Sequence, residues 1–101
     1  MMNDVQIVIT NNEFLRQFEA VIQNELITVE YSQQERKIFL TKLKMPDPLK
    51  DEGYLELFLE KLLGQIQEGR DRVVPTSPEI ATFIRKNRRK YKDLLPVGIN
   101  I

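Results

Sequence analysis

The first 45 residues form a series of short segments in which apolar and polar side chains alternate. Alternation with a period of two is typical of strands that are buried on one face. On this basis we predict strands at residues 5–10, 17–22, 26–31 and 37–45, with turns at Asn11-Asn12, Gln23-Asn24 and residues 32–35. Turns this short connect neighbouring antiparallel strands, so the pattern predicts a meander.

The middle of the chain changes to the spacing of a helix. Residues 45–53 contain two prolines within three positions and are predicted as a loop. Apolar residues then recur at the i, i+3, i+4 and i+7 spacing of one helix face, at Leu55, Phe58, Leu59, Leu62, Leu63 and Ile66. Gly69 is expected to end this helix, and residues 72–75 to form a fifth strand. Because a helix joins them, the fourth and fifth strands are predicted to be parallel.

A last helix is predicted from three consecutive residues after Thr76. Ser77 offers a hydroxyl for the N-cap, Pro78 suits the first helical position and Glu79 suits the first turn. The apolar stripe of this helix is expected to contain Ile80, Phe83, Ile84 and Tyr91. The chain is therefore predicted to be one α/β (α+β) domain over residues 1–95, followed by a short tail at residues 96–101. Its mixed sheet combines an antiparallel meander with a β-α-β unit, and a C-terminal helix follows.

Composition narrows the chemistry that this domain can perform. The 101 residues include no Cys and no His, which excludes disulfides, thiolate nucleophiles, imidazole bases and the usual zinc sites. A hydrophobic fraction of 42% with 30% charged residues is typical of a globular domain. No run of about 18 apolar residues occurs, so we expect a cytoplasmic protein without a membrane segment.

Charge is unevenly distributed although the net charge is zero. Residues 1–68 hold 12 acidic and 7 basic side chains, whereas residues 69–101 hold 3 acidic and 8 basic ones. Six of the eight residues at positions 85–92 are basic. A solvated helix end explains such a run, since cations are favourable there. The functional alternatives are contact with the phosphate of a cofactor, with an acidic protein or with a nucleic-acid backbone. Nucleic acid is the weakest of these, because Tyr91 is the one aromatic residue in the run.

Several short segments carry a resemblance to a known family. They are Asn11-Asn12-Glu13, Phe39-Leu40-Thr41, Met45-Pro46, residues 49–53, Val73-Val74-Pro75, Ser77-Pro78 and residues 91–95. In this order and at these spacings they resemble the small, single-domain type of the GNAT family of N-acetyltransferases. Members of this type often carry a Cys-Pro pair at the start of the last helix. The resemblance covers residues 11–95 and implies a GNAT-like fold.

The resemblance implies acetyl-CoA as cofactor and an amine as acceptor. The pantetheine arm would pair with the exposed edge of the fourth strand, around Leu43 and Met45. The pyrophosphate would lie at the start of the following helix. The resemblance therefore assigns six residues around this helix start to the cofactor: Lys50, Asp51, Glu52, Gly53, Tyr54 and Leu55.

The active positions differ from the family pattern. Asp51 and Glu52 stand where the family has Gly and a neutral or basic residue, and Leu55 replaces a small residue. Ser77 replaces the Cys, and Lys42 stands where the family commonly has His. We therefore expect acetyltransferase activity that is weak or lost. The alternative is a non-catalytic GNAT-fold module that binds a protein through its basic helix or its open sheet edge.

Four of the candidate site residues also have purely structural interpretations. Ser77 either donates a hydrogen bond to a thioester carbonyl or caps the last helix. Asp51 and Glu52 either bind a cation or a basic partner, or stabilise a helix start through its dipole. Gly53 either belongs to a phosphate-binding turn or forms an ordinary junction between loop and helix.

Overall fold

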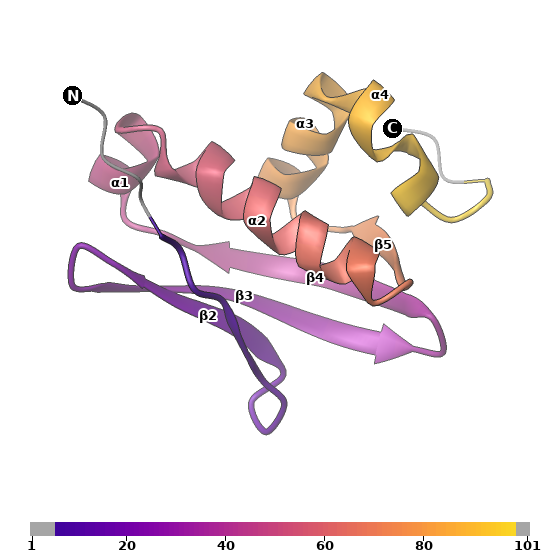
Figure 1. Cartoon of the computed structure of the whole chain (residues 1–101), viewed down its shortest axis with the longest axis horizontal. Helices are drawn as coiled ribbons and strands as arrows, with labels where there is room; N and C mark the ends of the chain where they lie inside the picture. The colour runs from indigo at the N-terminus through magenta and orange to yellow at the C-terminus, as the bar shows by residue number, and fades with distance from the viewer. Residues whose placement is uncertain (1–5, 99–101) are drawn as a thin grey trace.

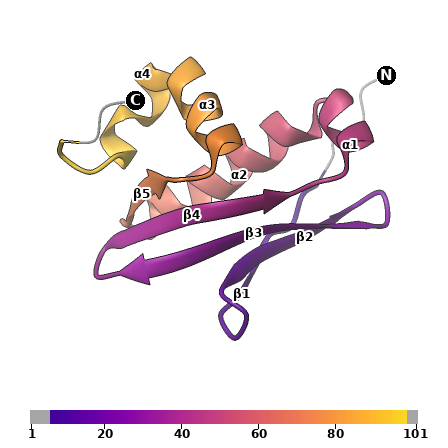
Figure 2. The ribbon, with the colours of Figure 1, turned by 180° about the vertical axis from the view of Figure 1, so that it is seen from behind.

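The computed structural model describes residues 6–98 as one mixed sheet with helices against a single face (Figures 1 and 2). The strands are β1 (Thr10–Asn12), β2 (Gln17–Ile22), β3 (Glu25–Gln34), β4 (Lys37–Lys44) and β5 (Arg72–Pro75). The helices are α1 (Asp47–Asp51), α2 (Tyr54–Glu68), α3 (Pro78–Lys86) and α4 (Arg88–Tyr91), and a 3-10 turn, η1, follows at Lys92–Leu94. In both views these helices lie on the same side of the sheet, and within the described part of the chain no helix covers the other face.

The strand order confirms the predicted meander and β-α-β unit. The strands lie in the order β1-β2-β3-β4-β5, so each one neighbours the next in the sequence. The pairs from β1 to β4 are antiparallel, whereas β5 pairs with β4 in parallel after α2. The domain is therefore a mixed α/β fold with a five-stranded sheet.

The N-terminal strand differs from the prediction. Residues 6–9 form no strand, β1 contains Asn11 and Asn12, and the turn lies at residues 13–16. Residue 5 lies outside the described residues. The Tyr31 hydroxyl donates a hydrogen bond to Asn11 Oδ1 at 2.7 Å, and Ile7 and Ile9 are buried without joining a ladder. A contact from a distant strand therefore overrides the local turn signal of the two asparagines.

The turn after the third strand also lies elsewhere. Residues 32–34 belong to β3, so the turn contains only Glu35 and Arg36 rather than residues 32–35. Ser32 pairs with Phe39 and Gln34 with Lys37 in the ladder to β4. Backbone hydrogen bonds to β4 therefore keep these polar residues extended.

The predicted loop at residues 45–53 contains α1. Pro46 is the N-cap residue and Pro48 lies in the first turn. Backbone N–H groups in the first turn have no partner within the helix, so these prolines remove no helical hydrogen bond. Leu49 is 3% exposed and anchors α1 on the core.

The predicted last helix is broken at Asn87. Asn87 has φ −119° and ψ 37°, and its Nδ2 donates a hydrogen bond to the Phe83 carbonyl at 2.8 Å. Its side chain thus competes with the helical backbone, which explains why α3 ends here and α4 starts anew. The predicted stripe is still confirmed, since Ile80, Ile84 and Tyr91 are buried and Phe83 packs against them partly exposed.

The core lies between α2 and the sheet. The apolar stripe predicted for α2 is confirmed, because five of its members are buried and the sixth, Leu55, is partly buried. They pack with fully buried residues of the strands, namely Ile27, Val29, Leu40 and Val73. Among residues 6–98, no helix has both the length and the apolar character needed to cross a bilayer.

Candidate functional site

The sheet divides at Leu40 of β4. β5 pairs only with the first four residues of β4, from Lys37 opposite Arg72 to Leu40 opposite Pro75. The Leu40 carbonyl accepts hydrogen bonds from Thr76 N at 3.1 Å, Thr76 Oγ1 at 3.0 Å and Ser77 N at 2.9 Å. Beyond Leu40, β4 continues to Lys44 paired with β3 on one side, while among residues 6–98 no strand pairs with its other edge. We call the space between residues 41–44 of β4 and the start of α3 the fork.

A bulge in β4 explains why the strands separate here. Tyr31 of β3 pairs with Leu40 and Glu30 pairs with Lys42, so Thr41 is an extra residue in β4. The Thr41 hydroxyl donates a hydrogen bond to the Glu30 carbonyl at 3.1 Å. An extra residue bends a strand and increases its twist, so β4 turns away just where its pairing with β5 ends.

The residues predicted for the pantetheine arm lie beyond this bulge. Leu43 is half-buried in the part of β4 that pairs with β3 alone, and Met45, which follows the strand, is 7% exposed. An unpaired strand edge presents N–H and C=O groups at regular intervals to an extended ligand. Leu43 therefore lies on the strand whose edge the resemblance assigned to the pantetheine arm, and Met45 follows the end of that strand.

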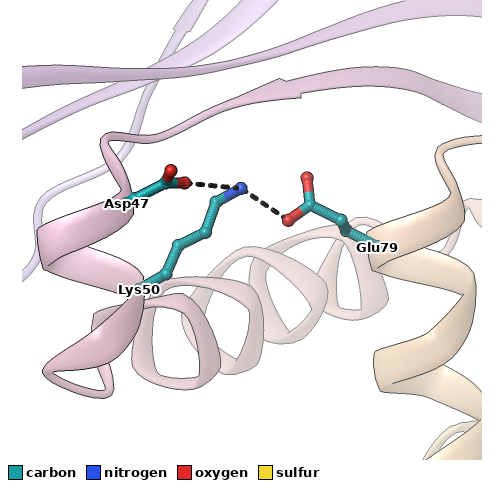
Figure 3. A network of polar contacts seen from close by, with 3 residues as sticks. All are labelled: Asp47, Lys50 and Glu79. Atoms are coloured by element: carbon teal, nitrogen blue, oxygen red, sulfur yellow. Dashed lines mark hydrogen bonds and ion pairs between the residues drawn. The ribbon is translucent and has the colours of Figure 1, made fainter.

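Lys50 is held by an ion pair that links α1 to α3 (Figure 3). Its Nζ lies 2.6 Å from Glu79 Oε2 and 3.9 Å from Asp47 Oδ1. The pair lies between the two helices, alongside the second half of β4. The cation predicted for a phosphate is therefore already balanced by carboxylates. Sequence reasoning assigned Glu79 only to a helix start, because no local pattern links residues 29 positions apart.

The start of α2 is tied to the β2–β3 turn. Gln23 Nε2 donates hydrogen bonds to Glu52 Oε1 at 3.3 Å and to the Tyr54 hydroxyl at 3.1 Å. Asp51 is exposed at the end of α1. Gly53 is the N-cap residue of α2 with φ +91°, and no side chain caps this end. An L side chain is strained at that φ, so the junction itself explains the glycine.

Ser77 lies at the base of the fork and is 3% exposed. It occupies the N-cap position of α3 with φ −69° and ψ 126°, but its hydroxyl makes no cap hydrogen bond. The predicted hydroxyl cap is therefore wrong. The Ser77 backbone makes the contacts instead, since its N–H binds Leu40 and its carbonyl accepts from Ala81 N at 2.9 Å.

The shifted pKa values lie away from the fork, where α4 meets α2. Burial raises the pKa of the Tyr91 hydroxyl, and the neighbouring Lys90 ammonium opposes this only in part. A hydrogen bond to Glu60 raises the pKa of Lys90, whose Nζ lies 3.1 Å from Glu60 Oε2. Among residues 6–98, no three acidic side chains gather as ligands for a metal ion.

Comparisons of the chain with models of known families and with curated proteins found no match. The fork and the residues around it are therefore the candidate functional site.

Proposed function

We propose that this domain binds acetyl-CoA in the fork and transfers the acetyl group weakly to a primary amine. The observation that supports this most directly is the unpaired edge of β4 beyond Leu40. The pantetheine arm is an extended chain with amide groups, so it can pair with a strand edge as an added strand does. The order of elements, a meander followed by β-α-β and a helix, supports the GNAT resemblance as well.

In this function β4 and the start of α2 would have separate tasks. The backbone around Leu43 and Met45 would pair with the pantetheine amides. The uncapped N–H groups at the start of α2, from Gly53 to Leu55, would face the pyrophosphate, because a helix N-terminus favours anions. An amine that is held beside the thioester attacks it directly, so Ser77 would serve at most as a hydrogen-bond donor.

Carboxylates around the fork account for the weak activity that we propose. Asp51 and Glu52 are exposed beside the start of α2, and each would repel a bound pyrophosphate by roughly 1 kcal/mol. Lys50 must also leave Glu79 before it can bind a phosphate. Lys50 and Glu79 have side chains that are 26% and 42% exposed, so breaking this pair costs about 0.2–1 kcal/mol.

A titration with acetyl-CoA, followed by backbone amide NMR shifts, tests the proposal. We expect saturable shifts concentrated in residues 41–55. Glu79→Gln should increase the affinity about 2- to 5-fold, because it frees Lys50. Glu68→Gln is the matched control, since it removes the same charge from the exposed far end of α2 and should change nothing.

One observation favours the alternative, a non-catalytic module that binds a protein. The Lys50–Glu79 pair already neutralises the cation on which a phosphate would depend. The same titration decides between the two functions. Absence of shifts at millimolar acetyl-CoA, in the parent and in Glu79→Gln alike, would reject cofactor binding and leave the interaction module.

A further inference from the structure

Six consecutive residues line one shallow hollow of about 410 Å³ where α3 meets α4. They are Arg85, Lys86, Asn87, Arg88, Arg89 and Lys90, all of them exposed, and we call this surface the basic corner. It lies at the end of α3 that is farthest from the sheet, where the chain turns into α4 (Figure 1). The basic corner is thus separate from the fork, which lies at the start of α3.

The helix break explains why these side chains surround a single hollow. Successive residues of an unbroken helix point about 100° apart, so six in a row face all sides of the axis. At Asn87 the backbone leaves the helical conformation, with φ −119° and ψ 37°. The hydrogen bond from Asn87 Nδ2 to Phe83 stabilises this break. The break therefore converts a dispersed basic run into a convergent group of cations.

The surroundings limit the extent of this positive surface. Glu60 of α2 lies 3.1 Å from Lys90 and balances one of the five cations. Screening in salt solution confines the remaining field to about 10 Å, so the zero net charge of the whole chain does not cancel it locally. A polyanion is attracted to this corner rather than to the domain as a whole.

The chemistry of the lining favours phosphates over other anionic partners. Every lining residue is charged or carries an amide, and the lining contains none of the aromatic or aliphatic residues that form the core of a protein interface. Tyr91, the aromatic residue of the run, is 2% exposed and packs against Phe83 with ring centroids 5.8 Å apart. It therefore offers no surface on which a base could stack. Arg and Lys suffice for contacts to a phosphate backbone.

We propose that the basic corner binds the phosphodiester backbone of a nucleic acid through its phosphates, without reading the base sequence. This inference is independent of the function proposed for the fork. It assigns a role to the basic run that differs from a solvated helix end. A phosphate-binding site predicts nucleic-acid binding that weakens steeply with salt, whereas a solvated helix end predicts no such binding.

Fluorescence anisotropy with a labelled DNA duplex of about 20 base pairs tests the proposal over about 20 to 200 mM salt. The test variant is Arg85→Gln with Arg89→Gln, which leaves the Lys90–Glu60 pair in place. The control is Lys37→Gln with Lys61→Gln, which removes two exposed cations elsewhere. Arg85→Lys with Arg89→Lys preserves the charge and shows whether any loss comes from misfolding.

We expect the parent to bind duplexes of unrelated sequence equally and to weaken steeply with salt. Loss of two phosphate contacts should reduce the slope of log K against log salt by about 1.8. It should lower the affinity at least tenfold at low salt, whereas the control and the lysine variant stay close to the parent. A single-stranded DNA and an RNA duplex of equal length identify which backbone fits best.

Three results would overturn the proposal. The first is no binding to any of these nucleic acids at about 20 mM salt, where phosphate contacts are strongest. The second is an equal loss of affinity in the control variant. The third is tighter binding to polyglutamate, or to vesicles rich in phosphatidylserine, than to the duplex. That result would assign the basic corner to an acidic protein or to a membrane surface.

Discussion

Replacing Tyr91 by Phe should stabilise this protein, although Tyr91 is one of its most deeply buried side chains. Tyr91 is 2% exposed, and its hydroxyl is buried without a hydrogen-bond partner among residues 6–98. A buried polar group without a partner costs about 1–3 kcal/mol, because it gives up its bonds to water. Tyr91→Phe removes this cost and keeps the ring in contact with Phe83.

The structure also indicates how large the stabilisation by Tyr91→Phe should be. The substitution removes only the hydroxyl oxygen and leaves the apolar area of the ring buried, so no large cavity forms. We expect a gain of about 1–2 kcal/mol in the free energy of unfolding. For a domain of this size, each kcal/mol corresponds to a rise of about 4–8 °C in the melting temperature.

Tyr31→Phe is the matched control, because the chemical change is the same and the surroundings differ. The Tyr31 hydroxyl donates a hydrogen bond to Asn11 Oδ1 at 2.7 Å. Losing it should lower stability by about 0.5–1.5 kcal/mol. Urea unfolding followed by circular dichroism measures both variants. If Tyr91→Phe lowered stability as much as Tyr31→Phe, the Tyr91 hydroxyl would have a partner and the reasoning would be refuted.

The same hydroxyl should make stability depend on pH. Its pKa is raised in the folded protein above the value of about 10 for an unfolded tyrosine. Below about pH 10 both states keep the proton, so its contribution to stability is constant. Above that pH the unfolded state ionises first, and stability falls until the folded pKa is passed. The parent should therefore lose stability relative to Tyr91→Phe as the pH rises above about 10.

Three further predictions concern the backbone and the core. Gly64→Ala, in the interior of α2 with open space around it, should add about 0.5–1 kcal/mol to the free energy of unfolding, whereas Gly53→Ala at φ +91° should lower it by about 1 kcal/mol or more. Thermal melting measures both variants, and changes of the same sign would contradict one of the two predictions. Leu59→Ala should cost about 2–5 kcal/mol in urea unfolding because Leu59 is 0% exposed, and a cost under 1 kcal/mol would place it outside the core. Thr76→Val should cost about 0.5–1.5 kcal/mol through the lost hydrogen bond to Leu40, and unchanged hydrogen exchange at the fork would speak against that bond.

Sequence alone determined the elements whose side chains face the core. Alternation in β2 to β4 and the apolar stripe of α2 depend on spacings of two to four residues, and these spacings specify a strand or a helix face locally. The parallel pairing of β5 with β4 could also be predicted from the sequence, because a helix joins these two strands. Leu43 and Met45 could be assigned to an unpaired strand edge only through the family resemblance.

Local signals failed where a distant contact competes with them. Asn11 and Asn12 suggest a turn, yet a hydrogen bond from Tyr31, 20 positions away, keeps them in a strand. The prolines at 46 and 48 suggest a loop, yet burial of Leu49 stabilises a short helix around them. Ser77 suggests a hydroxyl cap, but in the structure it is the Ser77 backbone N–H that donates a hydrogen bond, to the Leu40 carbonyl of β4.

Only the tertiary structure decided what lies close enough to act together. The ion pair of Lys50 with Glu79 joins residues 29 positions apart, and the bulge at Thr41 opens the fork through a pairing with another strand. The basic run was evident in the sequence, but the break at Asn87 made it converge on one hollow. Sequence patterns record the faces of single elements, whereas distances between elements arise only when those faces pack against one another.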